Sequence, residues 1–214
     1  MPSVNMTNLI QDVIQSIKFI HTHAVEYNGT TAKIALIGHS CGGHLAMLTY
    51  LMMSSSEIRS SISCICSLSG IFDLKPIQNS YLNIESLHLS NDDVQKYSVV
   101  QATPGDGTTT TTKLSNKDGS LSSSVHCPVM IAVGGGETKF FINESKKVSS
   151  NNNFEYHEFE SFNHYEMAHL LLSIGKNSDT TAGANSNDKK SDNQNNNTVV
   201  SFLLKHLLLS KENT

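Results

Sequence analysis

The sequence has little positive charge and no long apolar run. Among its 214 residues, 15 are Lys or Arg and 19 are Asp or Glu, which gives a formal net charge of −4. This balance provides no electrostatic attraction to nucleic acid or to an anionic membrane surface. Residues 1–5 contain no basic segment leading into an apolar one, and no later apolar run reaches the length of a membrane span. We therefore expect a cytoplasmic protein that binds neither nucleic acid nor a membrane.

Metal and nucleotide motifs are also missing from the sequence. It contains no H-E-x-x-H, and its four cysteines lack the spacing of a metal site. The glycines at 134–136 lack the G-x-G-x-x-G spacing of a dinucleotide-binding loop. We therefore expect no metal and no cofactor. The cysteines fall in or beside predicted strands, which favours reduced, buried thiols over disulfides. They are Cys41, Cys64, Cys66 and Cys127.

Two polar tracts interrupt the chain. Residues 101–124 include five consecutive threonines, and residues 176–197 are rich in Asn, Ser and Asp. Neither tract can bury apolar surface, so both are predicted to be disordered insertions. The remaining segments form one set of core-like runs, which predicts a single domain over residues 1–214.

Four short runs predict strands that alternate with helices. The run at 33–38 is apolar on both faces, as in a strand inside a parallel sheet, whereas 154–159 alternates and suits an edge. Strands separated by helices indicate an α/β sandwich with a mostly parallel sheet. The other predicted strands are 62–68 and 125–133. Predicted helices cover 8–27 with Asn8 and Gln11 as a capping pair, the stretch after residue 43, a short segment capped by Ser90, 140–149, 165–174 and 199–209.

The motif G-x-S-x-G lies between the first strand and the helix that follows it. It runs from Gly38 through Ser40 to Gly42. In this context a sharp strand-to-helix turn exposes a serine hydroxyl as a nucleophile, and the next backbone N–H can face a developing oxyanion. We therefore predict that Ser40 is the nucleophile and that Cys41 supplies one oxyanion donor. The alternative is that Ser40 is an ordinary serine in a Gly-rich turn.

A serine nucleophile needs a base and an orienting acid, which in this architecture follow it in the order acid, then histidine. Glu137 comes just after the third predicted strand, and His164 comes in the loop after the fourth. Both would lie at the carboxyl edge of the sheet, beside the elbow. Asp73, after the second strand, is the alternative acid. Glu137 could instead be a solvated residue at the start of a helix.

The sequence resembles the α/β-hydrolase superfamily, and within it the arylformamidase (kynurenine formamidase) branch and its feruloyl-esterase-like relatives. This resemblance implies a three-layer sandwich, the nucleophile Ser40, the acid Glu137 and the base His164. Because the acid of the family is often Asp, Asp73 remains open. It also implies hydrolysis of N-formylkynurenine to kynurenine and formate, a step of tryptophan catabolism. The stretches that carry it are 38–46, 68–74, Pro76 and Ile77, 80–83, 133–138 with Phe141 and Ser145, and 163–166.

The resemblance also implies that the sequence holds only the C-terminal portion of the fold, with about four strands. No His-Gly-Gly loop precedes Ser40, although such a loop would supply the second oxyanion donor. The strand 33–38 would then be an open, apolar edge that invites self-association or pairing with a partner chain. A truncated product, a half that needs a partner polypeptide and an incomplete gene model all fit this pattern.

Three functions remain open at this stage. The first is an arylformamidase, and the second is a small carboxylesterase that acts on aryl or acetyl esters. The third is a non-catalytic fragment that keeps the residues of the site without a complete oxyanion hole. The small-molecule partner is accordingly a formamide or an ester substrate.

Overall fold

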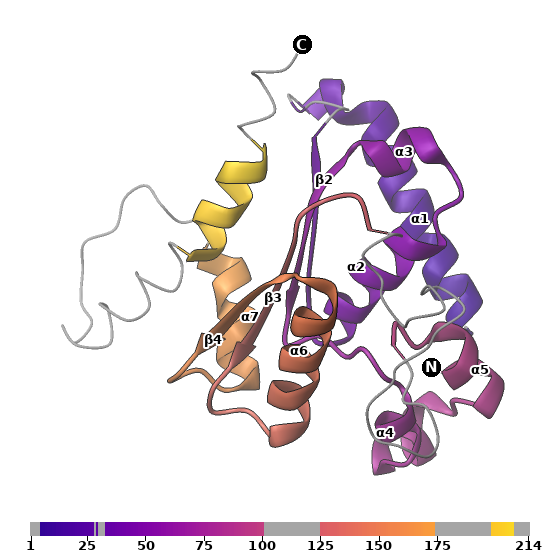
Figure 1. The fold of residues 1–214 in the computed structure, drawn as a ribbon. Helices are drawn as coiled ribbons and strands as arrows, with labels where there is room; N and C mark the ends of the chain where they lie inside the picture. Colours follow the sequence, from indigo (N-terminus) through magenta and orange to yellow (C-terminus); the bar gives the residue numbers. More distant parts are fainter. Residues whose placement is uncertain (1–4, 28, 30–32, 101–124, 174–197, 208–214) are drawn as a thin grey trace.

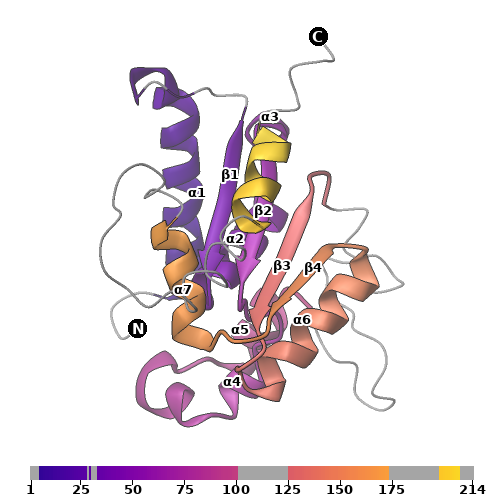
Figure 2. The ribbon, with the colours of Figure 1, turned by 90° about the vertical axis from the view of Figure 1, so that its left-hand side faces the viewer.

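Four parallel strands form an open sheet in the order β1-β2-β3-β4 (Figures 1 and 2). This computed structural model describes residues 5–27, 29, 33–100, 125–173 and 198–207. Both polar tracts that we predict to be disordered, 101–124 and 176–197, therefore lie outside the described residues. The strands are β1 (Ile34–His39), β2 (Ile62–Leu68), β3 (Val129–Gly134) and β4 (Glu155–Phe159). The predicted α/β architecture with a parallel sheet is confirmed.

The third strand begins later than the sequence suggests. β3 starts at Val129, not at residue 125, because Pro128 has no N–H to donate to a neighbouring strand. Its carbonyl still accepts a hydrogen bond from the Ile65 N–H at 3.0 Å. All six residues of β3 are buried, as expected for a strand between two neighbours in a parallel sheet.

Helices cover both faces of the sheet (Figures 1 and 2). On one face, α1, α2 and α6 enclose a core that contains Ile65 and Ile131 of the central strands. The other face of those strands packs against α7 and a final helical segment at 198–207. Alternate residues of a strand point to opposite faces, so β2 and β3 serve both cores. The long helices are α1 (Met6–His23), α2 (Cys41–Met52), α6 (Lys139–Asn152) and α7 (His164–Ser173).

The first helix is capped differently from the prediction. α1 begins at Met6 and ends at His23, and a short 3₁₀ turn, η1 (Ala24–Tyr27), follows it. The N-cap is Asn5, whose side chain accepts a hydrogen bond from the Asn8 N–H at 2.9 Å. The predicted cap by Asn8 and Gln11 is therefore wrong, because a suitable Asx residue lies three positions earlier.

Short helices fill the connections between β1, β2 and β3. The segment after β2 lies at the carboxyl end of the strands, near the start of α6 (Figure 2). Its last helix has the predicted cap: the Ser90 side chain accepts from the Asp93 N–H, and Asp93 accepts from the Ser90 N–H. The short elements are α3 (Ser56–Ser60), α4 (Lys75–Gln78), the π-helical turn η2 (Asn83–Leu87) and α5 (Asn91–Tyr97).

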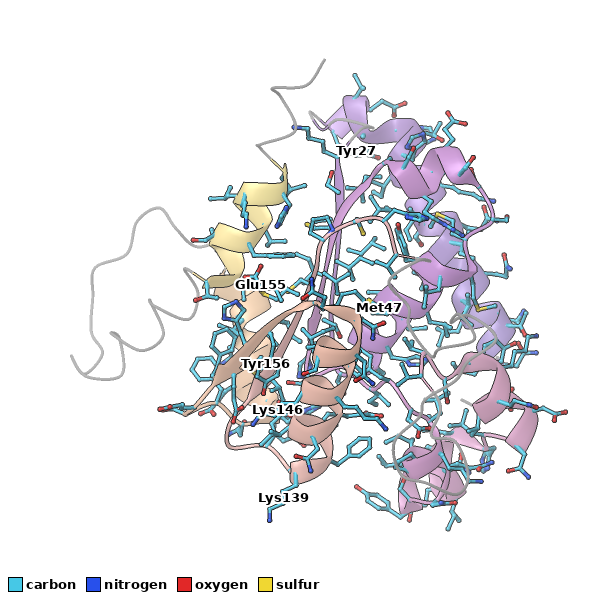
Figure 3. The ribbon with its side chains drawn as sticks, viewed as in Figure 1. Tyr27, Met47, Lys139, Lys146, Glu155 and Tyr156 are labelled. Carbon is cyan, nitrogen blue, oxygen red and sulfur yellow. The ribbon has the colours of Figure 1, made fainter. Side chains whose placement is uncertain are left out.

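The two edge strands differ in chemistry. β4 carries charged and polar side chains, including Glu158, which pairs with Lys146 of α6 at 2.9 Å. In Figure 3, Lys146 on α6 and Tyr156 on β4 project beside each other. Charged residues on an edge discourage pairing with another chain. Within the described part of the chain, β1 pairs only with β2, and its run from Ile34 to Ile37 has no charge.

All four cysteines are free, but they are not all buried. Cys64 and Cys66 are buried in β2, whereas Cys41 is exposed at the tip of the turn that starts α2. The expectation of buried thiols is therefore wrong for Cys41, and Cys127 is only half-buried. Burial raises the pKa of Cys64 to about 11 and that of Cys66 further, so both remain thiols at neutral pH. Within the described ranges, no helix combines the length and apolarity needed to cross a membrane.

Candidate active site

Ser40 stands at a sharp turn between β1 and α2. Its backbone has φ 56° and ψ −120°, a conformation that L residues rarely adopt. Its N–H donates to the Leu68 carbonyl of β2 at 2.8 Å, which fixes the turn to the sheet. Two residues earlier, a Cβ atom on Gly38 would lie 2.1 Å from the Gly42 carbonyl oxygen. The elbow therefore depends on Gly38 and presents the Ser40 side chain at the carboxyl edge of the sheet.

His164 is placed by the cap of α7, of which it is the first residue. The Asn163 side-chain oxygen accepts from the N–H groups of Tyr165 and Glu166, at 2.9 and 3.1 Å. In return, the Glu166 carboxylate accepts from the Asn163 N–H at 2.7 Å. This reciprocal arrangement is a capping box, and it holds the loop after β4 in one conformation.

Glu137 follows β3 and is fully buried at its side chain. Its Oε2 atom lies 2.6 Å from Nδ1 of His164. Its Oε1 atom accepts hydrogen bonds from the Gly134 N–H, at 3.0 Å, and from the Ser69 hydroxyl. Within the described residues, the donors to this carboxylate come from the ends of β2 and β3 and from His164, so both of its buried oxygens have hydrogen-bond partners.

The loops that carry the acid and the base are joined through their backbones. The Gly135 N–H donates to the Phe159 carbonyl at 2.9 Å, and the Gly136 N–H donates to the Phe162 carbonyl at 3.0 Å. A Cβ atom on Gly134 would lie 2.1 Å from the Phe162 oxygen. The Gly-Gly-Gly stretch thus serves close approach of two loops, which a side chain would prevent.

Three of the residues predicted from the sequence meet in one hydrogen-bonded line. Nε2 of His164 lies 2.9 Å from Oγ of Ser40, and its Nδ1 contacts Glu137. In this tautomer Nδ1–H donates to the carboxylate, and Nε2 can accept the proton of the serine hydroxyl. The imidazole is partly exposed, with 27% of its side-chain surface accessible, so a substrate can reach it.

Of the other two predicted residues, Cys41 adjoins this hydrogen-bonded line and Asp73 does not. Asp73 is not at the imidazole: its side chain accepts from the Lys75 N–H at 2.8 Å, and its own N–H donates to Glu144. The structure therefore places Glu137, and not Asp73, against the histidine. Cys41 is the first residue of α2, so its backbone N–H has no acceptor within the helix and adjoins Ser40. The positive end of the helix dipole adds to this anion-binding character.

The sequence analysis gave no function to His39, which occupies the first variable position of the G-x-S-x-G motif. Nε2 of His39 donates to the backbone carbonyl of His164 at 2.7 Å, and the two rings lie 4.6 Å apart. Burial lowers the pKa of His39, and the neighbouring His164 lowers it further. Phe141 of α6 packs against the other histidine ring, also at 4.6 Å between centroids. These contacts span more than 20 residues in sequence, and no local pattern signals them.

A buried histidine and a half-buried glutamate hold the segment after β2. Nδ1 of His44 donates to the Ile71 carbonyl at 2.9 Å, and burial lowers the pKa of this histidine to about 4. The Glu144 carboxylate accepts from the N–H groups of Phe72 and Asp73, at 3.3 and 2.7 Å. Burial raises the pKa of Glu144 to about 8.

A cavity of about 350 Å³ lies between α6 and the start of α4, lined by Asp73, Lys139, Glu144 and Lys147 among others. Ser40 and His164 do not line it. Lys139 marks that end of α6 in Figure 3. Among the described residues, no three His, Cys, Asp or Glu side chains are grouped so that they could hold a metal ion.

Comparisons with known proteins identify a family and a fold. The model of the BD-FAE family matches residues 2–117, which is more than half of the chain. Among curated proteins, none matches the sequence. Similar solved structures include a protein from Silicibacter sp. TM1040 described as a candidate thioesterase. It has a TM-score of 0.57 and 20% identity over 79% of this chain, and this chain spans only 55% of its length.

Two further solved structures are similar over almost the whole chain. A sugar hydrolase from Lactococcus lactis has a TM-score of 0.60 and 18% identity, covering 96% of this chain and 73% of its own. A thermophilic esterase from Thermogutta terrifontis has a TM-score of 0.53 and 16% identity, with coverages of 99% and 68%. At these identities the likeness establishes the α/β-hydrolase fold.

Proposed function

Because this chain belongs to the BD-FAE family and has the α/β-hydrolase fold, we propose that it is a serine hydrolase that cleaves carboxylic esters. The observation that carries this proposal is the hydrogen-bonded line from Ser40 through His164 to the buried Glu137. A nucleophile, a base and an orienting acid in mutual contact are the arrangement that acyl transfer requires.

In the first half of the proposed reaction, Oγ of Ser40 attacks the ester carbonyl carbon while its proton passes to Nε2 of His164. Glu137 stabilises the resulting imidazolium through its contact with Nδ1 and remains ionised. The C–O bond to the alcohol then breaks, and the leaving alkoxide takes the proton from His164. The product is an acyl ester on Ser40.

In the second half, water replaces the alcohol. His164 accepts a proton from the water as the water oxygen attacks the acyl carbon, and it returns that proton to Oγ of Ser40. The carboxylic acid is released and the hydroxyl is restored. In both halves the Cys41 N–H, at the start of α2, faces the oxygen that becomes negatively charged.

The lack of a loop that would supply a second oxyanion donor lowers the rate of ester hydrolysis that we expect. A Gly-rich loop before Ser40 would supply this donor, and residues 1–39 contain no such loop. Loss of one donor lowers turnover by about 10²- to 10³-fold. We therefore expect both the formation and the hydrolysis of the acyl-enzyme to be slow in this chain.

A direct comparison of hydrolysis rates distinguishes an ester substrate from a formamide substrate. The esterase among the similar structures favours an ester for this chain, whereas the arylformamidase hypothesis rests on the resemblance of the sequence alone. We expect faster hydrolysis of 4-nitrophenyl acetate than of N-formylkynurenine, measured at equal concentrations. A large preference for N-formylkynurenine would contradict this expectation and support the arylformamidase hypothesis.

Labelling with a fluorophosphonate probe tests the nucleophile independently of substrate choice. Oγ of Ser40 displaces fluoride, so the wild-type chain should gain the mass of the phosphonyl group and Ser40→Ala should not. His164→Ala should slow labelling strongly. A folded wild-type sample that stays unlabelled would contradict the proposed function and favour the non-catalytic alternative.

A further inference from the structure

We propose that Ser69 is a positioning residue of this triad, whose hydroxyl fixes the carboxylate of Glu137 in the orientation that meets His164. The inference rests on the proposed function and deepens it. Ser69 is the first residue after β2, at the start of the Ser-Gly-Ile-Phe-Asp stretch. Its hydroxyl donates to Oε1 of Glu137 across 68 residues of sequence.

The Ser69 backbone is anchored at the same place as the acid. Its N–H donates to the Ala132 carbonyl of β3 at 2.7 Å, and the residue is fully buried. β3 leads directly into the loop that carries Glu137. The hydroxyl and the carboxylate are thus held by neighbouring strands, so their separation varies little.

The donors around the Glu137 carboxylate give the Ser69 hydroxyl a defined task. Among the described residues, Oε1 accepts from Ser69 and from the Gly134 N–H, whereas Oε2 accepts from Nδ1 of His164. Glutamate has one more side-chain torsion than aspartate, and its carboxylate can rotate about the last of them. Two donors on Oε1, from the ends of two different strands, oppose this rotation and direct Oε2 at the imidazole.

The backbone of Ser69 supports the same conclusion. Its φ is 50°, in the left-handed region where a residue with a side chain is disfavoured and glycine is not. A glycine at this position would adopt the turn without that cost. A serine held in a strained conformation with its side chain on the acid indicates that the hydroxyl is needed.

Ser69→Ala and Ser69→Gly form a matched pair for the test. Both remove the hydroxyl, but Gly also removes the backbone strain, so Ser69→Gly should fold at least as stably as Ser69→Ala. We expect kcat/KM for 4-nitrophenyl acetate to fall by about 10- to 100-fold in both, the effect of losing a hydrogen bond to a charged group. Activity restored in Ser69→Gly would show that only the turn matters and would overturn the inference.

A double-mutant cycle separates positioning from a structural role. In a Glu137→Gln background, Ser69→Ala should cost less than about 3-fold, because the carboxylate that Ser69 orients is already gone. An equal loss in both backgrounds would contradict the inference. The comparison uses the rate of fluorophosphonate labelling, which remains measurable when turnover is low.

A spectroscopic measurement keeps this inference separate from the proposed function. The Nδ1 proton of His164 should resonate far downfield in the wild-type proton NMR spectrum, because it lies in a short hydrogen bond to Glu137. Ser69→Ala should move or broaden that resonance. If the wild-type chain is not labelled at Ser40, the proposed function fails. If the resonance is the same in both proteins, the positioning role of Ser69 fails.

Discussion

The Nε2 atom of His39 lies 2.7 Å from the backbone carbonyl oxygen of His164, so the residue before the proposed nucleophile holds the residue proposed to activate it. His39→Phe would keep an aromatic ring against His164 and remove the donor. We expect kcat/KM to fall by about 3- to 10-fold, as for the loss of one neutral hydrogen bond. His39→Gln retains an N–H donor and should lose less. Steady-state kinetics on both variants provide the measurement, and a larger loss in His39→Gln than in His39→Phe would show that the ring, and not the donor, is what matters.

One pair of substitutions tests whether Glu137 or Asp73 is the acid of the triad. Glu137→Gln removes the charge that stabilises the His164 imidazolium, and we expect kcat to fall by about 10³- to 10⁴-fold. Asp73→Asn is the matched control and should change kcat by less than about 3-fold, since its side chain bonds Lys75. Kinetics at saturating ester decide between them. The assignment of the acid fails if Asp73→Asn has the larger effect.

Gly38 and Gly42 flank the nucleophile but differ in the space around them. A methyl group on Gly38 would lie 2.1 Å from a backbone oxygen, whereas one on Gly42 would meet no atom within 4 Å. Gly38→Ala should therefore lower the melting temperature by several degrees or prevent folding, because the backbone of the elbow must move. Gly42→Ala should melt within about 2 °C of the wild type, by the usual effect of a substitution without steric conflict. Thermal melts followed by circular dichroism test both expectations.

Glu144 should make stability depend on pH. Burial raises its pKa from 4.5 to about 8, Asp73 adds to the rise, and Lys147 opposes it. Between these pH values the folded protein keeps a proton that the unfolded chain has lost, so the free energy of unfolding falls as pH rises. The lowered pKa values of His39 and His44 act in the opposite direction, but only below pH 6.5.

The effect of Glu144 on the free energy of unfolding is therefore best measured between pH 6.5 and pH 8. Urea denaturation at three pH values in this range should show a declining free energy of unfolding in the wild type. Glu144→Gln carries no titrating proton at this position and should flatten the decline. A slope that persists in Glu144→Gln would mean that another group is responsible.

The open edge of β1 predicts self-association. The Ser40 N–H donates to Leu68, so the alternation of a parallel strand points the N–H of Ala35 away from β2. Ala35→Pro would remove that outward donor and leave the pairing with β2 in place. Sedimentation should show wild-type dimers or larger species at micromolar concentration and fewer of them in Ala35→Pro. A monomeric wild-type protein would contradict the prediction.

The sequence predicts the elements of this fold better than their ends. The bounds of β2 follow from an apolar run closed by Ser69 and Gly70, and the structure agrees with them. The bounds of α1 do not, because Asn5 and Asn8 are both suitable caps and only packing selects between them. The first strand ends one residue later than predicted, at His39, since this residue still pairs with β2.

The candidate site shows the same division. The chain order of Ser40, Glu137 and His164, each after a strand, was enough to predict that they would meet at one edge. The hydroxyl of Ser69 and the ring of His39 were not predictable, because their contacts depend on how strands pack across more than 60 residues. Side chains that contact the acid and the base from other elements leave no periodic trace in the sequence.

The backbone bonds between the glycine loop and the loop before α7 make the carboxylate and the imidazole one mechanical unit. One hydrogen bond, from His39 to the His164 carbonyl, joins this unit to the turn that carries Ser40. The distance between hydroxyl and imidazole therefore depends on that bond, whereas the distance between imidazole and carboxylate is set by the two loops themselves.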